Sequence, residues 1–378
     1  MILYHRSYLA LVAAAFAFSA YGQLVEHSAD AVLRDAVLDA SASTLYATAS
    51  DTGEIVKIDA ATGNVVARVS VGRSPGSLAS DGSTLACVNR SGKTVSLVRL
   101  GDFTVLGEAS IGDGADEIAA LPGGGFAVVN SFSDSVTLID PAHANSPVAI
   151  GGVASVPSGI AASESYLAVS TRSPAAVLIY AGGSQTPTAT VPVPEGPSRI
   201  AALPGDRFAV MTKTAVVIVD AGSARIAASA EIEARDLAAY GDRLFILRTG
   251  SVDVRDASLT AMGSVPIQGD ARSIAASATG FALLSPKSKS WMLCSSLPED
   301  AKGQVAAEPL QVAQALPVAP AFEAPATDTT ATAPAEAKPG PAAPAQEPAT
   351  PGPAVAPQVP VAAEPIPSAP APAPSTAS

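Results

Sequence analysis

A short pattern of apolar and small residues returns seven times along the chain, at intervals of 37 to 42 residues. Each copy has an aliphatic residue, two small residues, a turn and then a run of apolar residues. The aliphatic residues, which we call anchors, are Leu38, Leu78, Ile118, Ile160, Ile200, Leu237 and Ile274. A fixed period of this length indicates stacked copies of one supersecondary unit, none of which can bury its apolar face alone.

Each copy predicts four short strands. In the third copy the strands are expected at 117–121, 125–131, 135–140 and 146–152, with the glycine turn 122–124 between the first two. No segment shows a sustained 3.6-residue apolar period, so helical repeats do not fit. Four short antiparallel strands in about 40 residues are typical of a propeller blade. The sequence therefore predicts an all-β protein, a seven-bladed β-propeller with four-stranded antiparallel blades.

Small residues mark the first strand of each copy. The two residues after each anchor are Ala or Ser in every copy except the first, where Asp39 follows Leu38. The innermost strand of a propeller lies where the blades converge, so large side chains would not fit there. We therefore expect the anchor strands to lie nearest the axis.

The last copy lacks a fourth strand. It has apolar strands at 272–277, 281–285 and 290–295, after which the chain becomes charged and rich in proline. The offset between an outer strand and the next anchor places a matching strand at 25–31, near the N-terminus. We expect this strand to complete the seventh blade and to remove its exposed edge.

The two ends of the chain differ from the repeats. Residues 1–22 have a weakly basic start, an apolar core and small residues before Gln23, as in a secretory signal peptide. No later stretch is apolar for the 18 or more residues that a membrane helix needs. The expected divisions are a signal peptide over 1–22, the propeller over 23–298 and a tail over 299–378. The chain is then exported, to the periplasm, the cell surface or the extracellular space.

The C-terminal tail is rich in alanine and proline. It contains 18 of the 32 prolines of the chain, the first of them Pro309. Proline lacks the backbone donor and restricts the preceding residue, so this segment is predicted to be disordered. Two interpretations stay open, a spacer or tether in the cell envelope and a solvated tail with no partner.

The chain is acidic, with a formal net charge of −12. Such a protein does not bind polyanions through its overall field, and we expect a monomer. Its two cysteines, Cys87 and Cys294, fall on strands of the second and seventh copies, too far apart for a disulfide. We expect both thiols to be buried and unpaired.

The predicted second strands, LYATAS, LACVNR, FAVVNS, LAVSTR and FAVMTK, share one pattern. With GEIVKIDAATGNVVARVSVGRSPGSLASDG, they resemble the forty-residue YVTN-type β-propeller repeat of secreted bacterial and archaeal proteins. The resemblance covers residues 25–297 and weakens in the last two copies. It implies an exported seven-bladed propeller, similar to lactonase-like and WD40-like propellers. Relatives bind nucleic acid, sit in surface layers or belong to the lactonase-like group, so it supports the fold more than the function.

Few residues suggest catalysis. His5 leaves with the signal peptide, while His27 lies on the closing strand and His143 in a loop, where both are expected at the surface. A catalytic triad or histidine metal site needs its members together, and Trp291 alone does not suggest a quinone cofactor. We therefore assign no catalytic residue, metal ligand or cofactor. The alternative is a lactonase-like hydrolase with a metal held by carboxylates in the central channel.

Repeated cations suggest a binding surface instead. The loops that enter the first strands and those that leave the second strands open on one face of a propeller. They carry eight cations at recurring positions, namely Arg73, Arg90, Arg172, Arg199, Lys213, Arg235, Arg248 and Arg272. Such a ring could bind a protein segment or an anionic polymer, such as an acidic glycan or single-stranded nucleic acid.

The same loops also carry acidic residues. These are Asp113, Asp116, Glu117, Glu195, Glu233, Asp236 and Asp270. The cations could therefore form exposed ion pairs of little energetic value, and Phe132 is the one obvious stacking platform for a base. The leading interpretation is an exported, non-enzymatic binding or scaffold module of the cell envelope, with its ligand open.

Overall fold

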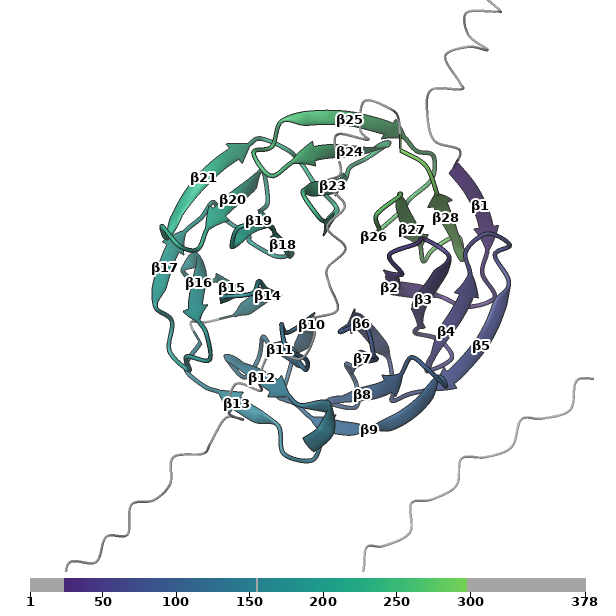
Figure 1. Cartoon of the computed structure of the whole chain (residues 1–378), viewed down its shortest axis with the longest axis horizontal. Helices are drawn as coiled ribbons and strands as arrows, with labels where there is room; N and C mark the ends of the chain where they lie inside the picture. The colour runs from purple at the N-terminus through teal and green to yellow at the C-terminus, as the bar shows by residue number, and fades with distance from the viewer. Residues whose placement is uncertain (1–23, 154–155, 298–378) are drawn as a thin grey trace, which may run out of the picture. The chain divides into compact units, whose positions relative to one another are not determined.

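Seven four-stranded antiparallel sheets form a ring in the computed structural model, which describes residues 24–153 and 156–297 (Figure 1). The first strand of each sheet lies innermost and the fourth forms the outer wall. The predicted all-β, seven-bladed propeller is therefore confirmed. The predicted signal peptide over 1–22 and the predicted tail over 299–378 lie outside the described residues.

The first four blades follow the chain in order. Blade 1 contains β2 (Leu33–Leu38), β3 (Thr44–Ala49), β4 (Glu54–Asp59) and β5 (Val65–Ser70). Blade 2 contains β6 (Pro75–Ser80), β7 (Thr84–Asn89), β8 (Thr94–Arg99) and β9 (Thr104–Ser110). Blade 3 contains β10 (Ala115–Ala120), β11 (Phe126–Asn130), β12 (Ser135–Ile139) and β13 (Val148–Ile150). Blade 4 contains β14 (Pro157–Ala162), β15 (Tyr166–Arg172), β16 (Ala175–Ala181) and β17 (Ala189–Pro192).

The remaining blades close the circle. Blade 5 contains β18 (Ile200–Leu203), β19 (Arg207–Met211), β20 (Val216–Asp220) and β21 (Arg225–Ala230). Blade 6 contains β22 (Asp236–Tyr240), β23 (Arg243–Leu247), β24 (Ser251–Asp256) and β25 (Ala261–Pro266). Blade 7 contains β26 (Ser273–Ala276), β27 (Phe281–Ser285), β28 (Ser290–Cys294) and β1 (Leu24–Ser28). Between β12 and β13 lies the 3-10 turn η1 (Pro141–His143). Among the described residues, no helix has the length and apolar character needed to cross a membrane.

The core is divided among the interfaces between blades. Seven clusters of buried apolar side chains occur, and each joins two adjacent blades. Valine, isoleucine, leucine and alanine dominate them, with one phenylalanine from the second strand in blades 3, 5, 6 and 7. Because each blade buries its two faces against its two neighbours, the stability of one blade depends on the next.

The ring closes through the N-terminal strand. β1 pairs antiparallel with β28, from Leu24 opposite Cys294 to Ser28 opposite Ser290. The closure predicted for residues 25–31 is therefore confirmed, although the strand ends at Ser28. His27 stacks on Trp291, with 4.5 Å between ring centroids, and is half-buried. The expectation that His27 is a surface residue was wrong, whereas His143 is exposed.

The register of blade 1 corrects one anchor. Leu78 pairs with Cys87 in blade 2, and the equivalent pair in blade 1 is Ala36 with Ala47, so Leu38 takes the position of Ser80. The first turn of blade 1 runs from Asp39 to Thr44, whereas the matching turn of blade 2 runs from Asp81 to Thr84. These two extra residues displaced the predicted anchor, and Ala36 is the first anchor of the structure.

Both cysteines are free and buried, as predicted. Burial raises the pKa of the Cys294 thiol to about 11, and it raises the pKa of Cys87 as well. Thiols protected in this way are poor nucleophiles.

Candidate binding site in the axial cavity

Equivalent residues from all seven blades surround the axis of the ring. We call the two residues directly before each anchor a channel pair. The pairs are 34–35, 76–77, 116–117, 158–159, 198–199, 235–236 and 272–273. Thirteen of these fourteen residues, all but Gly159, line a cavity of about 460 Å³, the axial cavity. The other described residues of its lining are Ser50, Ser74, Pro75, Arg90, Arg172 and Met211.

Irregular pairing directs these side chains inward in the first four blades. In blades 1, 2 and 3 the register of the first strand shifts across the channel pair, as between Leu33 and Ala36. Blade 4 has a similar shift between Pro157 and Gly159. An extra residue of this kind bends the strand and re-aims a side chain. The channel pairs can therefore face the axis while the anchors behind them stay in the apolar core.

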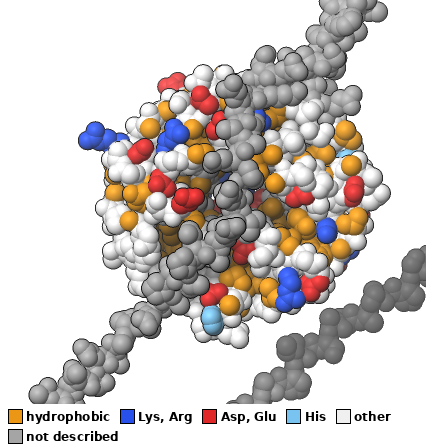
Figure 2. Space-filling view, viewed as in Figure 1, with side chains coloured by type: hydrophobic (Ala, Val, Ile, Leu, Met, Phe, Trp, Pro, Cys, Tyr) orange, Lys and Arg blue, Asp and Glu red, His pale blue; other side chains and the backbone are white. Residues whose placement is uncertain are grey.

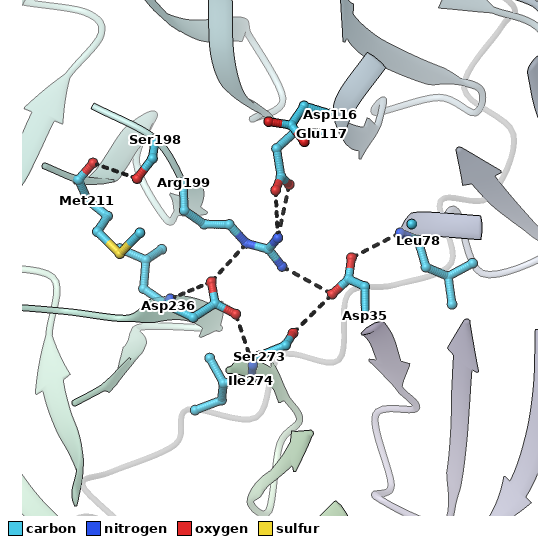
Figure 3. A network of polar contacts seen from close by, with 12 residues as sticks. Asp35, Leu78, Asp116, Glu117, Ser198, Arg199, Met211, Asp236, Ser273 and Ile274 are labelled. Carbon is cyan, nitrogen blue, oxygen red and sulfur yellow. Dashed lines mark hydrogen bonds and ion pairs between the residues drawn. The ribbon is translucent and has the colours of Figure 1, made fainter. Parts of the chain in front are cut away.

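Arg199 lies at the centre of the axial cavity (Figure 3). Its Nη1 donates to both carboxylate oxygens of Glu117, at 2.9 and 3.0 Å. Its Nη2 donates to Asp35 at 3.3 Å, and its Nε lies 3.2 Å from Asp236. Blades 1, 3, 5 and 6 thus meet at one guanidinium. Ser273 of blade 7 adds a hydrogen bond to Asp35 at 3.2 Å.

Two of these carboxylates also join neighbouring blades through the backbone. Asp35 accepts a hydrogen bond from the amide of Leu78, and Asp236 accepts one from the amide of Ile274, each at 3.0 Å. Both amides belong to the anchor of the next blade. The same acidic position therefore makes the same contact in blades 1 and 6.

Burial and charge shift the titration of this cluster. The exposed fractions of the side chains are 23% for Arg199, 21% for Glu117, 9% for Asp35 and 7% for Asp236. Burial, together with the nearby charges of Asp35 and Asp236, raises the pKa of Glu117 to about 7 against the opposing effect of Arg199. Burial also raises the pKa of Asp236. Although burial disfavours its charge, the three carboxylates hold the pKa of Arg199 well above its usual value.

Arginines outnumber acidic residues in the lining of the axial cavity. The lining contains six arginines, namely Arg34, Arg90, Arg172, Arg199, Arg235 and Arg272. Against them stand four acidic residues, Asp35, Asp116, Glu117 and Asp236, which leaves a formal charge of +2. The cavity is thus locally positive in an acidic protein, an arrangement that favours an anionic ligand.

The arginines differ in how far their charge is already neutralised. Arg90 lies 2.7 Å from Asp116. Arg235 and Arg272 share Asp270, which lies outside the cavity lining, at 2.9 and 3.0 Å. Arg34 and Arg172 are exposed, and neither forms an ion pair within the part of the chain that the structure describes. These two residues have the guanidinium groups most available to a ligand.

Five of the eight cations singled out from the sequence therefore line the axial cavity, and three do not. Arg73 and Lys213 are exposed but outside its lining, and Arg248 is turned into its own blade, where it lies 3.0 Å from Asp253. The predicted ion pairs with neighbouring acids also occur, as between Arg90 and Asp116. On the parts of the face that the described residues show in Figure 2, acidic and basic side chains are interspersed.

Sequence analysis missed Arg34 and Asp35. The available signal was the channel pair, because the two residues before each of the other six anchors include three of the predicted cations and the acids Asp116, Glu117 and Asp236. With Leu38 as the first anchor, the pair in blade 1 would have been Ala36 and Val37. The two extra residues in the first turn of blade 1 therefore prevented the identification of Asp35 from the sequence.

The carboxylates of the axial cavity do not fit the alternative of a metal-dependent hydrolase. Asp35, Glu117 and Asp236 converge, but each directs an oxygen to the guanidinium of Arg199. A divalent metal prefers several carboxylate or carbonyl oxygens around one point, and here Arg199 lies at that point. No group of three or more metal-binding side chains occurs among residues 24–153 and 156–297.

Comparison with known proteins supports the fold alone. No protein-family model matches the chain, and no curated protein is significantly similar to it in sequence. Similar solved structures include hydrazine synthase of Kuenenia stuttgartiensis, with 17% identity and a TM-score of 0.60 over 72% of this chain and 98% of that chain. U3-55K has 13% identity and a TM-score of 0.61, over 72% and 98%. The β-propeller domain of Cps50 (Swd1) from Myceliophteria thermophila has 13% identity and a TM-score of 0.61, over 72% and 99%.

Proposed function

We propose that this chain is an exported, non-enzymatic β-propeller of the YVTN type that acts as a binding module of the cell envelope. We further propose that the axial cavity binds an acidic peptide segment of a protein partner. The observation that carries this proposal is the convergence of six arginines, from six different blades, on one cavity. Export rests on the sequence of residues 1–22, which has the features of a signal peptide.

The chemistry of the cavity favours a carboxylate ligand. The planar guanidinium of arginine donates two parallel hydrogen bonds to a carboxylate, which gives both charge and direction. Arg34 and Arg172 are exposed and available for such contacts. Residues of all seven blades line the cavity, so it suits a side chain or a chain end better than a long polymer lying across the face.

An aromatic residue on the same face favours a peptide over a nucleic acid. Among the described residues, the cavity lining contains no aromatic side chain on which bases could stack. Phe132, in the turn between β11 and β12 of blade 3, is 84% exposed. A single exposed aromatic beside a charged cavity can anchor an apolar residue of a peptide. We therefore expect an acidic segment that also carries an apolar side chain.

The binding test uses fluorescence anisotropy with the chain from residue 23 onward. The probe is a labelled acetylated peptide of six aspartates and one leucine at 50 mM salt, compared with labelled single-stranded DNA and an acidic oligosaccharide. We expect saturable binding of the peptide that weakens as salt rises, since screening reduces attraction between charges. Absence of saturable peptide binding would refute the proposed ligand, and tighter binding of DNA or oligosaccharide would replace it with that class.

A matched pair of variants locates the binding surface. R34A/R172A removes the two available cavity arginines and is expected to weaken peptide binding at least tenfold. R207A/R225A makes the same change of charge at the starts of β19 and β21, which follow turns on the opposite face. This control should bind as the parent does. An equal loss in both variants would show that overall charge, rather than the axial cavity, governs binding.

A further inference from the structure

Glu117 links the wall of the axial cavity to the central guanidinium, which belongs to Arg199. It lies on β10, lines the axial cavity and binds Nη1 of Arg199 through both oxygens. The same guanidinium also forms ion pairs with Asp35 and Asp236. Three carboxylates, the buried Asp35 and Asp236 and the partly buried Glu117, thus share one positive charge, which leaves a formal charge of −2 in the cluster when all are ionised. Negative charge in excess at a buried site favours uptake of a proton.

The groups around Glu117 leave few other sites for that proton. Asp35 and Asp236 face it across the cavity, and on its own strand Asp116 is paired with Arg90. The adjacent inner strands, β6 and β14, contribute no titratable side chain. The second strand β7 contributes only Cys87, whose thiol is buried. The two described histidines lie elsewhere, His27 on the outer strand β1 and His143 in η1.

We propose that an acidic ligand binds the axial cavity together with one proton, which Glu117 takes up from solvent. This inference rests on the proposed function. A ligand carboxylate at the cavity arginines brings a fourth negative charge close to Asp35, Glu117 and Asp236. Protonation of Glu117 removes one of these charges and weakens its hold on Arg199, so the guanidinium becomes available to the ligand. No bond other than the O–H bond of the carboxyl group is formed.

Ligand binding and protonation must then favour each other, because linkage between two binding equilibria is reciprocal. Affinity for the peptide rises as the pH falls, by at most one proton per ligand. Glu117 titrates near neutral pH, since its pKa is raised to about 7. The change is therefore expected between about pH 6 and pH 8. In this range the aspartates of the probe remain ionised, because their pKa values are near 4.

The test compares peptide affinity at pH 6 and pH 8 in the parent chain, E117Q and D236N, with a dye insensitive to pH. We expect the parent to bind about fivefold or more tightly at pH 6. E117Q should bind with the same affinity at both values. D236N, which changes the other buried carboxyl group with a raised pKa, should keep a pH dependence. Loss of the dependence in D236N but not in E117Q would overturn the assignment to Glu117.

A second measurement does not depend on variants. Calorimetric titration of the parent chain at pH 7, in two buffers with different ionisation enthalpies, reports the protons taken up on binding. We expect an uptake between zero and one proton, clearly above zero. Saturable binding with no uptake and no pH dependence would refute the proton coupling alone. Absence of saturable binding at both pH values would instead refute the proposed function.

Discussion

Both carboxylate oxygens of Glu117 accept hydrogen bonds from one nitrogen of Arg199, although the two residues are 82 positions apart in the chain. Glu117 belongs to blade 3, and Arg199 directly precedes the first strand of blade 5. The remaining contacts of the guanidinium reach blades 1 and 6. A single side chain at the axis therefore ties blade 5 to its neighbour blade 6 and also to blades 1 and 3, with which blade 5 shares no apolar cluster. The site is thus part of the framework of the ring.

Replacement of Arg199 by methionine should destabilise the propeller strongly. Asp35, Glu117 and Asp236 would lose their shared cation and remain buried as uncompensated charges. Removing one partner of a buried ion pair typically costs about 3–5 kcal/mol. Urea unfolding, followed through the fluorescence of Trp291, measures the free energy of unfolding. The exposed Arg73 gives the control R73M, which should differ from the parent by about 0.5 kcal/mol or less. A similar small change in R199M would contradict a structural role for the cluster.

The substitution E117Q should change how stability depends on pH. The pKa of Glu117 is raised from 4.5 to about 7, so the folded chain keeps a proton that the unfolded chain releases. The contribution of this group to stability is thus present below about pH 4.5 and is lost as the pH rises toward 7. Each unit of pKa difference corresponds to about 1.4 kcal/mol.

The difference between E117Q and the parent isolates this group, because other carboxyl groups titrate in both proteins. E117Q should gain stability relative to the parent as the pH rises from 4.5 to 7, and the difference should then stay constant. Urea unfolding at pH 4.5, 5.5, 6.5 and 7.5 measures it. A constant difference over the whole range would show that Glu117 has an ordinary pKa in the folded chain.

Removal of the closing strand should open the ring between blades 7 and 1. Without residues 23–28, β28 loses its five paired partners and Trp291 loses the ring of His27 that stacks on it. We expect a marked fall in the thermal midpoint. Trp291 is the single tryptophan of the chain and is fully buried, so its emission should shift to longer wavelength. The control is the chain that starts at residue 23. An unchanged midpoint and emission would refute the role of β1 in closure.

The fold was predictable because its signals are local and repeated. The anchors recur at 37 to 42 residues, and each copy carries turn residues such as Asp81 and Gly82 between its first two strands. Even the closure followed from a missing strand at one end and a spare strand at the other. The one error in this pattern, Leu38 in place of Ala36, arose where a longer turn shifted the count by two residues.

The site was predictable only in part because its geometry is not local. The sequence placed Arg199 among eight similar cations, yet it alone reaches the axis and gathers three carboxylates. Which side chain crosses the axial cavity depends on the relative positions of seven blades, which no repeat pattern contains. Arg248 shows the same limit, because it lies two residues after the partner of its anchor, whereas Arg90 lies three residues after the partner of its own anchor. The guanidinium of Arg248 contacts Asp253 of its own blade instead of lining the axial cavity.

The cysteines offer a test of how tightly the blades pack. Cys87 and Cys294 are fully buried, and burial raises the pKa of Cys294 to about 11. At pH 8 little reactive thiolate exists, and reagent cannot reach it. We expect no alkylation by iodoacetamide in the folded chain and two equivalents in urea, as counted by mass spectrometry. Fast labelling of Cys294 under native conditions would indicate that the closing blade opens readily.

Substitution of Gly159 by alanine should disturb the cavity from blade 4. Gly159 belongs to a channel pair, and a β-carbon there would lie 1.8 Å from the carbonyl oxygen of Ser198. That backbone directly precedes Arg199, so relief of the overlap must move the central guanidinium. Overpacking of this kind typically costs about 1–3 kcal/mol. G159A should therefore lower the free energy of unfolding and also weaken peptide binding. The control is G101A, because a β-carbon at Gly101 meets no atom within 4 Å. If both variants keep the parent's stability and affinity, the close approach of blades 4 and 5 does not position Arg199.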